Sequence, residues 1–223
     1  MSVRGVVLSR TEMSGDTFCT SVAIDRGGRW EQVRLLTAGN SHPRCDGFPY
    51  PREEILKKWV PGRVIMLPEP EARDPRPTHP EDRLVDLGQI VLGEKMEHAY
   101  VLAIVCALTF RSARALFPNI VWQGNGKAYV PGDRPQDRSV GYVSCERITV
   151  LANEFAQLRT RAGESLLCKI KSELFLSNIR RGRVPVNANY PAETARLGLA
   201  NPTDWEGRFN PPRCYVMLTG TVR

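Results

Sequence analysis

Short apolar runs separated by turn residues dominate the first part of the chain. Four of these runs cover residues 4–9, 17–24, 30–36 and 62–67, and the first breaks between them, at 14–16 and 25–28, are rich in Gly and Asp. Runs of this length, bounded by such residues, are typical of β-strands joined by tight turns. The pattern predicts a small antiparallel β-barrel.

Two segments interrupt this strand pattern. Residues 51–59 begin with Pro, have acids in the first turn and end with two lysines, which predicts one short helix. Residues 68–80 contain five prolines. Because proline cannot donate a hydrogen bond to a neighbouring strand, we expect an extended surface segment there rather than a central strand.

The second half of the chain repeats the strand pattern with different lengths. The apolar run at 100–110 predicts a buried strand and is too short to cross a membrane. A short helix is expected at 112–117, ended by Pro118, and the turn at 124–126 predicts a hairpin between 120–122 and 127–130. Further strands are expected at 139–145, 147–151, 165–172 and 213–223. The chain is therefore predicted to be mostly β.

The charge is distributed unevenly between the two halves. Residues 1–100 carry 14 Lys/Arg and 15 Asp/Glu, a net of −1, whereas residues 101–223 carry 17 and 9, a net of +8. Basic surfaces commonly bind polyphosphate backbones, because neutralising phosphates releases condensed counterions. The asymmetry favours a nucleic-acid partner for the second half, with a basic surface that has no ligand as the alternative.

The densest group of cations follows residue 158. Lys169 and Lys171 are two positions apart, so on a strand they lie on one face, opposite Cys168 and Ile170. Arginines after residues 174–176 are expected in a loop, where guanidinium groups could bind phosphates. The candidate nucleic-acid-binding residues are Arg159, Arg161, Lys169, Lys171, Arg180, Arg181 and Arg183. Candidate stacking partners are Phe175, Tyr190 and Trp205, each of which could instead belong to the core.

Neither a metal nor a cofactor is predicted. The six cysteines include no CxxC pair, and those inside apolar stretches are expected to be buried free thiols. The three histidines form no HxH or HExxH motif, although Glu81, Asp82 and Asp86 lie near His79. A metal-dependent nuclease or hydrolase that uses these acids therefore remains an alternative.

Several short motifs resemble bacterial proteins that contain dual OB domains. They are Val-Val-Leu-Ser-Arg at 6–10, Ser-Gly at 14–15, Phe-Cys at 18–19, Gly-Arg-Trp-Glu-Gln-Val-Arg at 28–34, the Pro/His/Glu segment at 75–83, and Cys-Tyr-Val-Met-Leu-Thr at 214–219. The resemblance implies two small OB-like antiparallel barrels packed in tandem with a few short helices. The N-terminal barrel with its Pro-rich strap would occupy residues 1–95, and the basic C-terminal barrel 96–223.

Fold and charge together predict the function. We expect a nucleic-acid-binding protein, an accessory component of a bacterial defence or DNA-processing system, that uses a basic face of its C-terminal half. A protein–protein adaptor in a larger complex is the alternative, since edge strands and the strap offer docking surfaces. The N-terminus lacks a secretory signal and no lipidation motif is present, so we expect a cytoplasmic protein without a membrane partner.

Overall fold

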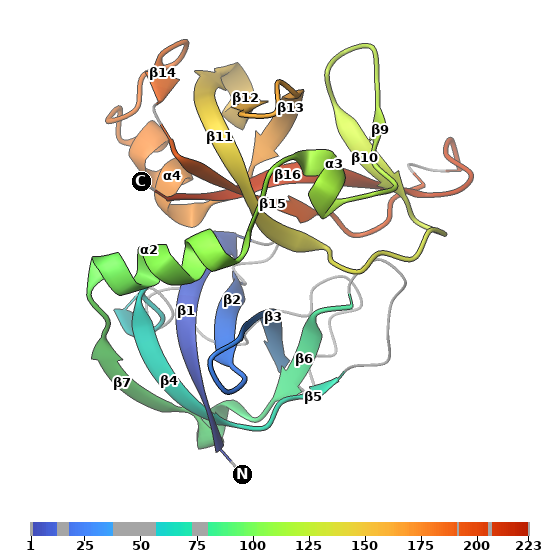
Figure 1. Cartoon of the computed structure of the whole chain (residues 1–223). Helices are drawn as coiled ribbons and strands as arrows, with labels where there is room; N and C mark the ends of the chain where they lie inside the picture. The colour runs from blue at the N-terminus through green and yellow to red at the C-terminus, as the bar shows by residue number, and fades with distance from the viewer. Residues whose placement is uncertain are drawn as a thin grey trace. The chain divides into compact units, whose positions relative to one another are not determined.

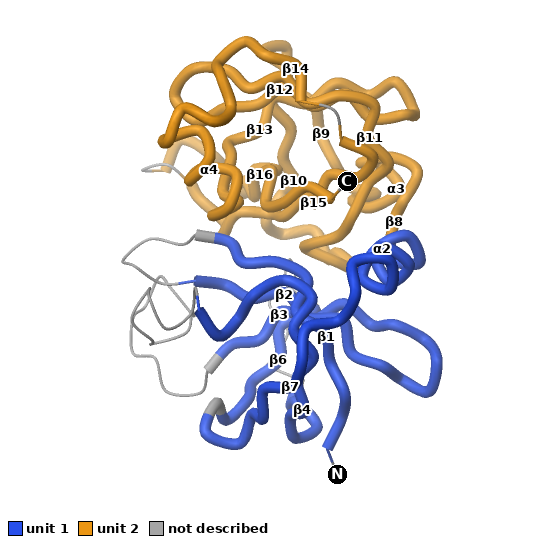
Figure 2. Tube along the Cα trace, turned by 90° about the vertical axis from the view of Figure 1, so that its left-hand side faces the viewer, with its two compact units in different colours: residues 1–74, 81–108 blue, residues 75–80, 109–223 orange. Residues whose placement is uncertain are grey.

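A computed structural model describes residues 2–12, 18–37, 57–72, 80–190, 192–204 and 207–222. The chain divides into two compact units, unit 1 with residues 1–74 and 81–108, and unit 2 with residues 75–80 and 109–223 (Figure 2). Residues 96–108, which were predicted to belong to the C-terminal barrel, group with unit 1. Both units are built mainly from strands, as predicted, with a few short helices.

Unit 1 is a seven-stranded sheet in the order β5-β6-β3-β2-β1-β4-β7 (Figure 1). Its elements are β1 (Ser2–Glu12), β2 (Phe18–Asp25), β3 (Trp30–Thr37), β4 (Arg63–Pro68), β5 (Glu71–Ala72), β6 (Asp82–Val85), η1 (Leu87–Gln89) and β7 (Val91–Lys95). The antiparallel strands β1, β2 and β3 follow one another, β4 returns antiparallel to β1, and β6 lies parallel to β3. The four strands predicted before residue 68 are confirmed.

The helix α2 (His98–Ala107) replaces the strand predicted at 100–110. Only Thr109 and Phe110 are extended, and they form β8. A short apolar run has no periodicity that separates a strand from a helix, and the alanines at 99, 103 and 107 favour the helix. The strand prediction was wrong because a fully buried strand was assumed, whereas Tyr100 and Cys106 are exposed.

Unit 2 contains a closed five-stranded barrel with additional strands. Its elements are β8 (Thr109–Phe110), α3 (Ala113–Leu116), β9 (Val121–Trp122), β10 (Ala128–Pro131), β11 (Val140–Leu151), η2 (Ala152–Glu154), β12 (Phe155–Thr160), β13 (Ser165–Ile170), α4 (Glu173–Arg180), β14 (Asn189–Tyr190), β15 (Thr194–Leu199) and β16 (Arg213–Val222). The strand order β13-β12-β11-β15-β16 closes through parallel pairing of β13 with β16. The hairpin β9–β10 extends the sheet from β16.

The two units share one connectivity. In unit 1, β1, β2 and β3 are antiparallel in sequence, β4 pairs antiparallel with β1, and β6 pairs parallel with β3. In unit 2, β11, β12 and β13 are antiparallel in sequence, β15 pairs antiparallel with β11, and β16 pairs parallel with β13. The first strand is long and carries a register shift in both units, between Val7 and Ser9 in β1 and between Cys145 and Arg147 in β11. Such bulges bend a strand so that it can pair with different neighbours along its length. Both units are OB-like.

Several local predictions for unit 2 are confirmed. Helix α3 begins after Ser112, whose hydroxyl accepts a hydrogen bond from the Ala115 amide, and the hairpin turn at 124–126 joins β9 to β10. The two strands predicted at 139–151 are one strand, β11. Strands β12 and β15 were not predicted. In β15 the apolar run is interrupted by Arg196, which is nevertheless buried.

Two predicted segments lie mainly outside the described residues. Of the helix predicted at 51–59, only Lys57 and Lys58 have described helical backbone. Of the proline-rich segment, Glu71–Ala72 forms β5, which pairs with β6 and lies at the edge of the sheet formed by the described strands. An edge position is the one that a proline-rich segment tolerates.

Candidate nucleic-acid interface

The strand β13 separates its side chains onto two faces, as the sequence predicted. Cys168 and Ile170 are fully buried in the barrel core, whereas Lys169 and Lys171 are partly exposed. Burial raises the pKa of the Cys168 thiol to about 12. Lys169 therefore belongs to the outer surface of the barrel.

Strand register arranges the outer surface of β11, β12 and β13 in rows, because residues directly opposite each other point to the same face of a sheet. We call this surface the outer face. Its rows are Arg147–Arg159–Ser165, Thr149–Gln157–Leu167 and Leu151–Phe155–Lys169. The side chains between these positions in the sequence, such as Leu158 and Leu166, are buried. One surface thus combines cations, hydroxyl and amide groups, and an aromatic ring.

One end of the outer face is hollowed. The hollow is lined by Arg147, Thr149, Gln157, Arg159, Gly163 and Ser165. Arg147 and Arg159 are directly opposite each other, an arrangement of like charges that destabilises a sheet unless an anion compensates it. Arg159 pairs with Glu146 at 3.0 Å, but both side chains are more than half exposed. Within the described part of the chain, Arg147 has no carboxylate at ion-pair distance. The hollow can therefore accept an anion.

The other end of the outer face is built around Phe155. The ammonium groups of Lys127 and Lys169 each lie 5.2 Å from the centroid of this ring. Lys169 also donates a hydrogen bond of 2.9 Å to the Asn153 carbonyl. Cations at this distance from an aromatic face are attracted by the ring quadrupole. The contacts hold two positive charges beside one ring.

Glu154 brings two of the predicted cations together. Its carboxylate accepts a hydrogen bond of 2.9 Å from Arg180 and lies 3.4 Å from the Lys169 ammonium. The hydrogen bond from Arg180, with the charges of both cations, holds the pKa of Glu154 below its ordinary value despite partial burial. Because two cations share one carboxylate, this group retains a net positive charge.

The loop predicted for the 180–183 arginines begins one residue later than expected. Arg180 is the last residue of the α4 helix, which starts after Ser172, whose hydroxyl accepts a hydrogen bond from the Phe175 amide. A basic residue in the last turn is favoured by the helix dipole. Helix α4 was not predicted, because its buried apolar side chains, Phe175 and Leu176, are too few to show a helical period in the sequence. Arg181 and Arg183 follow it and are exposed.

The remaining predicted residues occupy separate places. Lys171 follows β13, and its amide donates to the Leu218 carbonyl. Arg161 lies in the turn after β12, where its Nε donates a hydrogen bond of 3.3 Å to the Cys145 carbonyl. The structure places Arg159 and Lys169 on the outer face and joins Arg180 to Lys169 through Glu154.

The aromatic candidates from the sequence do not include Phe155, the partly exposed ring of this surface. Phe175 is 3% exposed and lies 4.9 Å from the Tyr190 ring. Trp205 lies outside the described residues. The residues that sequence reasoning missed are Lys127, Arg147 and Phe155. The alternation Phe-Ala-Gln-Leu-Arg-Thr at 155–160 was the signal for an exposed face that begins with Phe155.

The acids considered for catalysis have structural partners in unit 1. The Asp82 carboxylate accepts two hydrogen bonds from Arg34, at 2.5 and 2.7 Å, and its side chain is 3% exposed. Asp86 accepts hydrogen bonds from the Gly88 amide and from Gln89. Among the described residues, no group of three or more His, Cys, Asp or Glu is placed to hold a metal ion.

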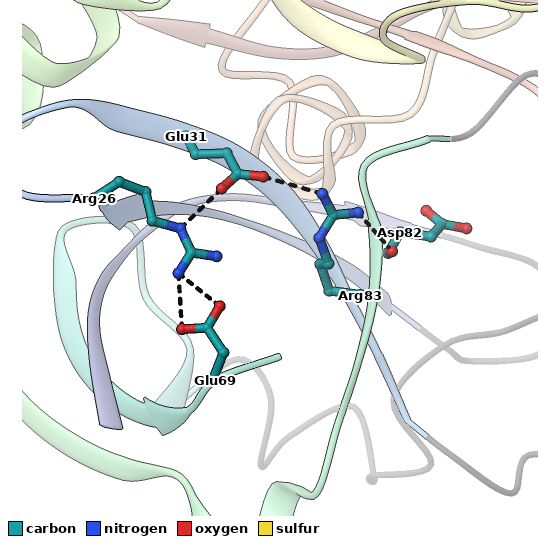
Figure 3. A network of polar contacts seen from close by, with 5 residues as sticks. All are labelled: Arg26, Glu31, Glu69, Asp82 and Arg83. Carbon is teal, nitrogen blue, oxygen red and sulfur yellow. Dashed lines mark hydrogen bonds and ion pairs between the residues drawn. The ribbon is translucent and has the colours of Figure 1, made fainter. Parts of the chain in front are cut away.

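A surface network of ion pairs lies next to Asp82 (Figure 3). Glu31 bridges Arg26 at 2.9 Å and Arg83 at 3.0 Å, and Arg26 also pairs with Glu69. Burial alone would raise the pKa of Glu31, but the hydrogen bonds and charges of the two arginines lower it. The network links β3 and β6 to Glu69, which follows β4, so Glu31 and Glu69 take part in ion pairs within unit 1.

The described residues contain no helix with the length and apolarity needed to cross a membrane. Among the described residues the longest helix, α2, has ten residues.

Comparison with known proteins gives no family for this chain. No family model matches, and no curated protein matches. Among solved structures, the p204 HINb domain is 11% identical, with a TM-score of 0.39 over 96% of this chain and 95% of that chain. The Ifi202 HINa domain in complex with 20-bp dsDNA is 9% identical, with a TM-score of 0.37 over 99% and 91%. A murine DNA-binding protein bound to dsDNA is 10% identical, with a TM-score of 0.32 over 89% and 85%.

Proposed function

We propose that this protein binds nucleic acid through the outer face of unit 2. The observation that carries the proposal is the strand register, which places Arg147, Arg159 and Lys169 on one face with Phe155. Guanidinium and ammonium groups neutralise backbone phosphates, and hydroxyl and amide groups can donate further hydrogen bonds to them. The face therefore has the composition of a phosphate-contacting surface on an OB-like barrel.

Salt dependence tests the proposal. Fluorescence anisotropy with labelled oligonucleotides is measured at salt concentrations between about 50 and 200 mM. The association constant falls as salt rises, and each lost phosphate contact makes the plot of log K against log salt less steep by about 0.7–0.9. The double variant R147Q/R159Q should weaken binding and make this plot less steep. The control is R29Q, which removes an exposed arginine from unit 1. Binding that does not respond to salt, or that weakens equally in the control, would refute the proposal.

An adaptor role is the second candidate, supported by a different surface. Met66 and Val91 are cross-strand neighbours in β4 and β7, and they are 37% and 65% exposed. Strand β7 is also a sheet edge. Exposed apolar side chains beside an unpaired strand edge are suited to binding an extended peptide. Stoichiometric co-purification of a protein that is lost in a V91K variant, together with no oligonucleotide binding, would support this role instead.

The resemblance to bacterial dual-OB proteins suggests the setting. We propose that the chain is an accessory component of a defence or DNA-processing system and acts in the cytoplasm. Co-purification with proteins and nucleic acid from the native host tests this, and recovery of the chain from a membrane or secreted fraction would argue against it.

A further inference from the structure

A second group of aromatic residues lies on the outside of unit 2, on β10 and β16. Along β16 the side chains of Cys214, Val216 and Leu218 are buried, while Tyr215 and Met217 between them are partly exposed. Tyr215 pairs with Tyr129 of β10, and their ring centroids are 6.0 Å apart. The Tyr215 ring therefore lies on the outer surface of the barrel rather than in its core.

An arginine lies between two rings in this group. The Arg213 guanidinium lies 4.5 Å from the centroid of Tyr129 and 3.8 Å from that of Phe209. Arginine held in this way keeps its charge while its position is fixed by the rings. The group thus combines aromatic surface with a fixed positive charge.

Strand register connects this group to Phe155. Lys169 is opposite Phe155 on one side and opposite Met217 on the other, so the three residues form one row. Tyr215 is two positions from Met217 on the same face of β16. Along the sheet, two strand spacings of about 4.8 Å and one two-residue step of about 6.7 Å separate the backbones of Phe155 and Tyr215 by at most about 12 Å. We call Phe155, Lys127, Lys169, Tyr129, Tyr215 and Arg213 the aromatic stripe.

A stripe of this kind distinguishes between two forms of nucleic acid. In a duplex the faces of the bases are covered by neighbouring bases. A surface that binds the duplex backbone therefore needs cations, and its aromatic rings cannot stack on the bases. In a single strand the base faces are accessible and stack on aromatic side chains, while cations hold the phosphates between them. The aromatic stripe contains both aromatic rings that can stack on bases and cations that can hold phosphates, and the two kinds of side chain lie next to each other along it.

We infer that the nucleic acid bound by unit 2 is single-stranded, with bases stacked on Phe155 and Tyr215 and phosphates held by Lys127 and Lys169. This inference rests on the proposed function and adds the strandedness of the ligand and the residues that recognise it. DNA and RNA strands share this chemistry, because stacking uses the base faces and not the sugar.

The test compares single strands with duplexes of the same sequence, as DNA and as RNA, using anisotropy on the full chain. Single strands should bind more tightly than duplexes. F155L and Y215L should each weaken single-strand binding about 5- to 150-fold, the range for loss of one stacked base. F155W and Y215F retain the rings and should restore binding, which separates stacking from a general loss of structure.

The control is Y100L, which removes an exposed tyrosine from α2 in unit 1 and should leave binding unchanged. Equal affinity for single strands and duplexes, or binding that tolerates F155L and Y215L, would overturn the inference while leaving the proposed function standing. Absence of salt-dependent binding to every oligonucleotide would overturn both.

Discussion

Removing the Glu154 carboxylate should make nucleic-acid binding tighter. Glu154 lies within 3.4 Å of the Lys169 ammonium and accepts a hydrogen bond from Arg180. In E154Q neither cation has this carboxylate to neutralise it, and glutamine keeps nearly the same volume. The repulsion between Glu154 and an approaching phosphate is also removed. Both effects act in the same direction.

The size of the effect follows from the distance at which a phosphate would sit. A phosphate held by Lys169 would lie about 7 Å from the Glu154 carboxylate, where two unit charges interact by about 0.6 kcal/mol at the dielectric constant of water and about 2.4 kcal/mol at an effective value of 20. Because the Glu154 side chain is 34% exposed, the lower part of this range applies. We expect about 1 kcal/mol, which is roughly fivefold in affinity.

Anisotropy titrations of E154Q against the unaltered protein measure this gain. The control is E193Q, which removes an exposed carboxylate from the same unit and therefore changes the net charge equally. If E154Q binds no more tightly than E193Q, Lys169 and Arg180 do not contact the ligand. The free energy of unfolding of E154Q, measured by thermal unfolding, should differ from that of the unaltered protein by less than about 1 kcal/mol, because exposed ion pairs contribute little to stability.

Two further predictions concern the folded state. D82A should lower the free energy of unfolding by about 3–5 kcal/mol in urea titrations, because it leaves the Arg34 guanidinium buried without its carboxylate. The control E94A, at an exposed position, should change the free energy of unfolding little, and equal effects of the two variants would refute the prediction. Burial raises the pKa of Cys168 from 9.0 to about 12. The neutral thiol therefore contributes fully to the free energy of unfolding below pH 9, and this contribution is lost as the pH rises toward 12. At pH 8 a thiol reagent should modify the exposed Cys106 and spare Cys168, and early modification of Cys168 would contradict the burial.

Local periodicity was sufficient to predict most strands and the placement of Lys169. Alternation of polar and apolar residues reports which side chains face the core, because a strand exposes every second residue. Cys168 and Ile170 were thereby assigned to the core, as the structure shows. The buried free thiols Cys19, Cys145, Cys168 and Cys214 agree with the same reasoning, whereas Cys106, in the apolar run 100–110, is exposed, and Cys45 lies outside the described residues.

The sequence could not predict features that depend on strand pairing. Arg147 and Arg159 are neighbours only because β11 and β12 pair in one register, and a shift by one residue would place them on opposite faces. Tyr129 and Tyr215 are separated by most of unit 2 along the chain and meet through the pairing of β10 with β16. Tertiary contacts of this kind leave no periodic signal within either segment.

The net charge of a segment does not locate a binding surface, because carboxylates that approach only in the fold neutralise part of it. Glu154 forms ion pairs with Lys169 and Arg180, and Glu146 forms one with Arg159. Three of the seven predicted cations therefore lie beside a carboxylate. Arg147 and Lys127 were absent from the prediction, yet they have no carboxylate at ion-pair distance within the described ranges. In the proposed interface, the attraction for phosphate would therefore depend on which cations share a face with few acids, and strand register determines which cations those are.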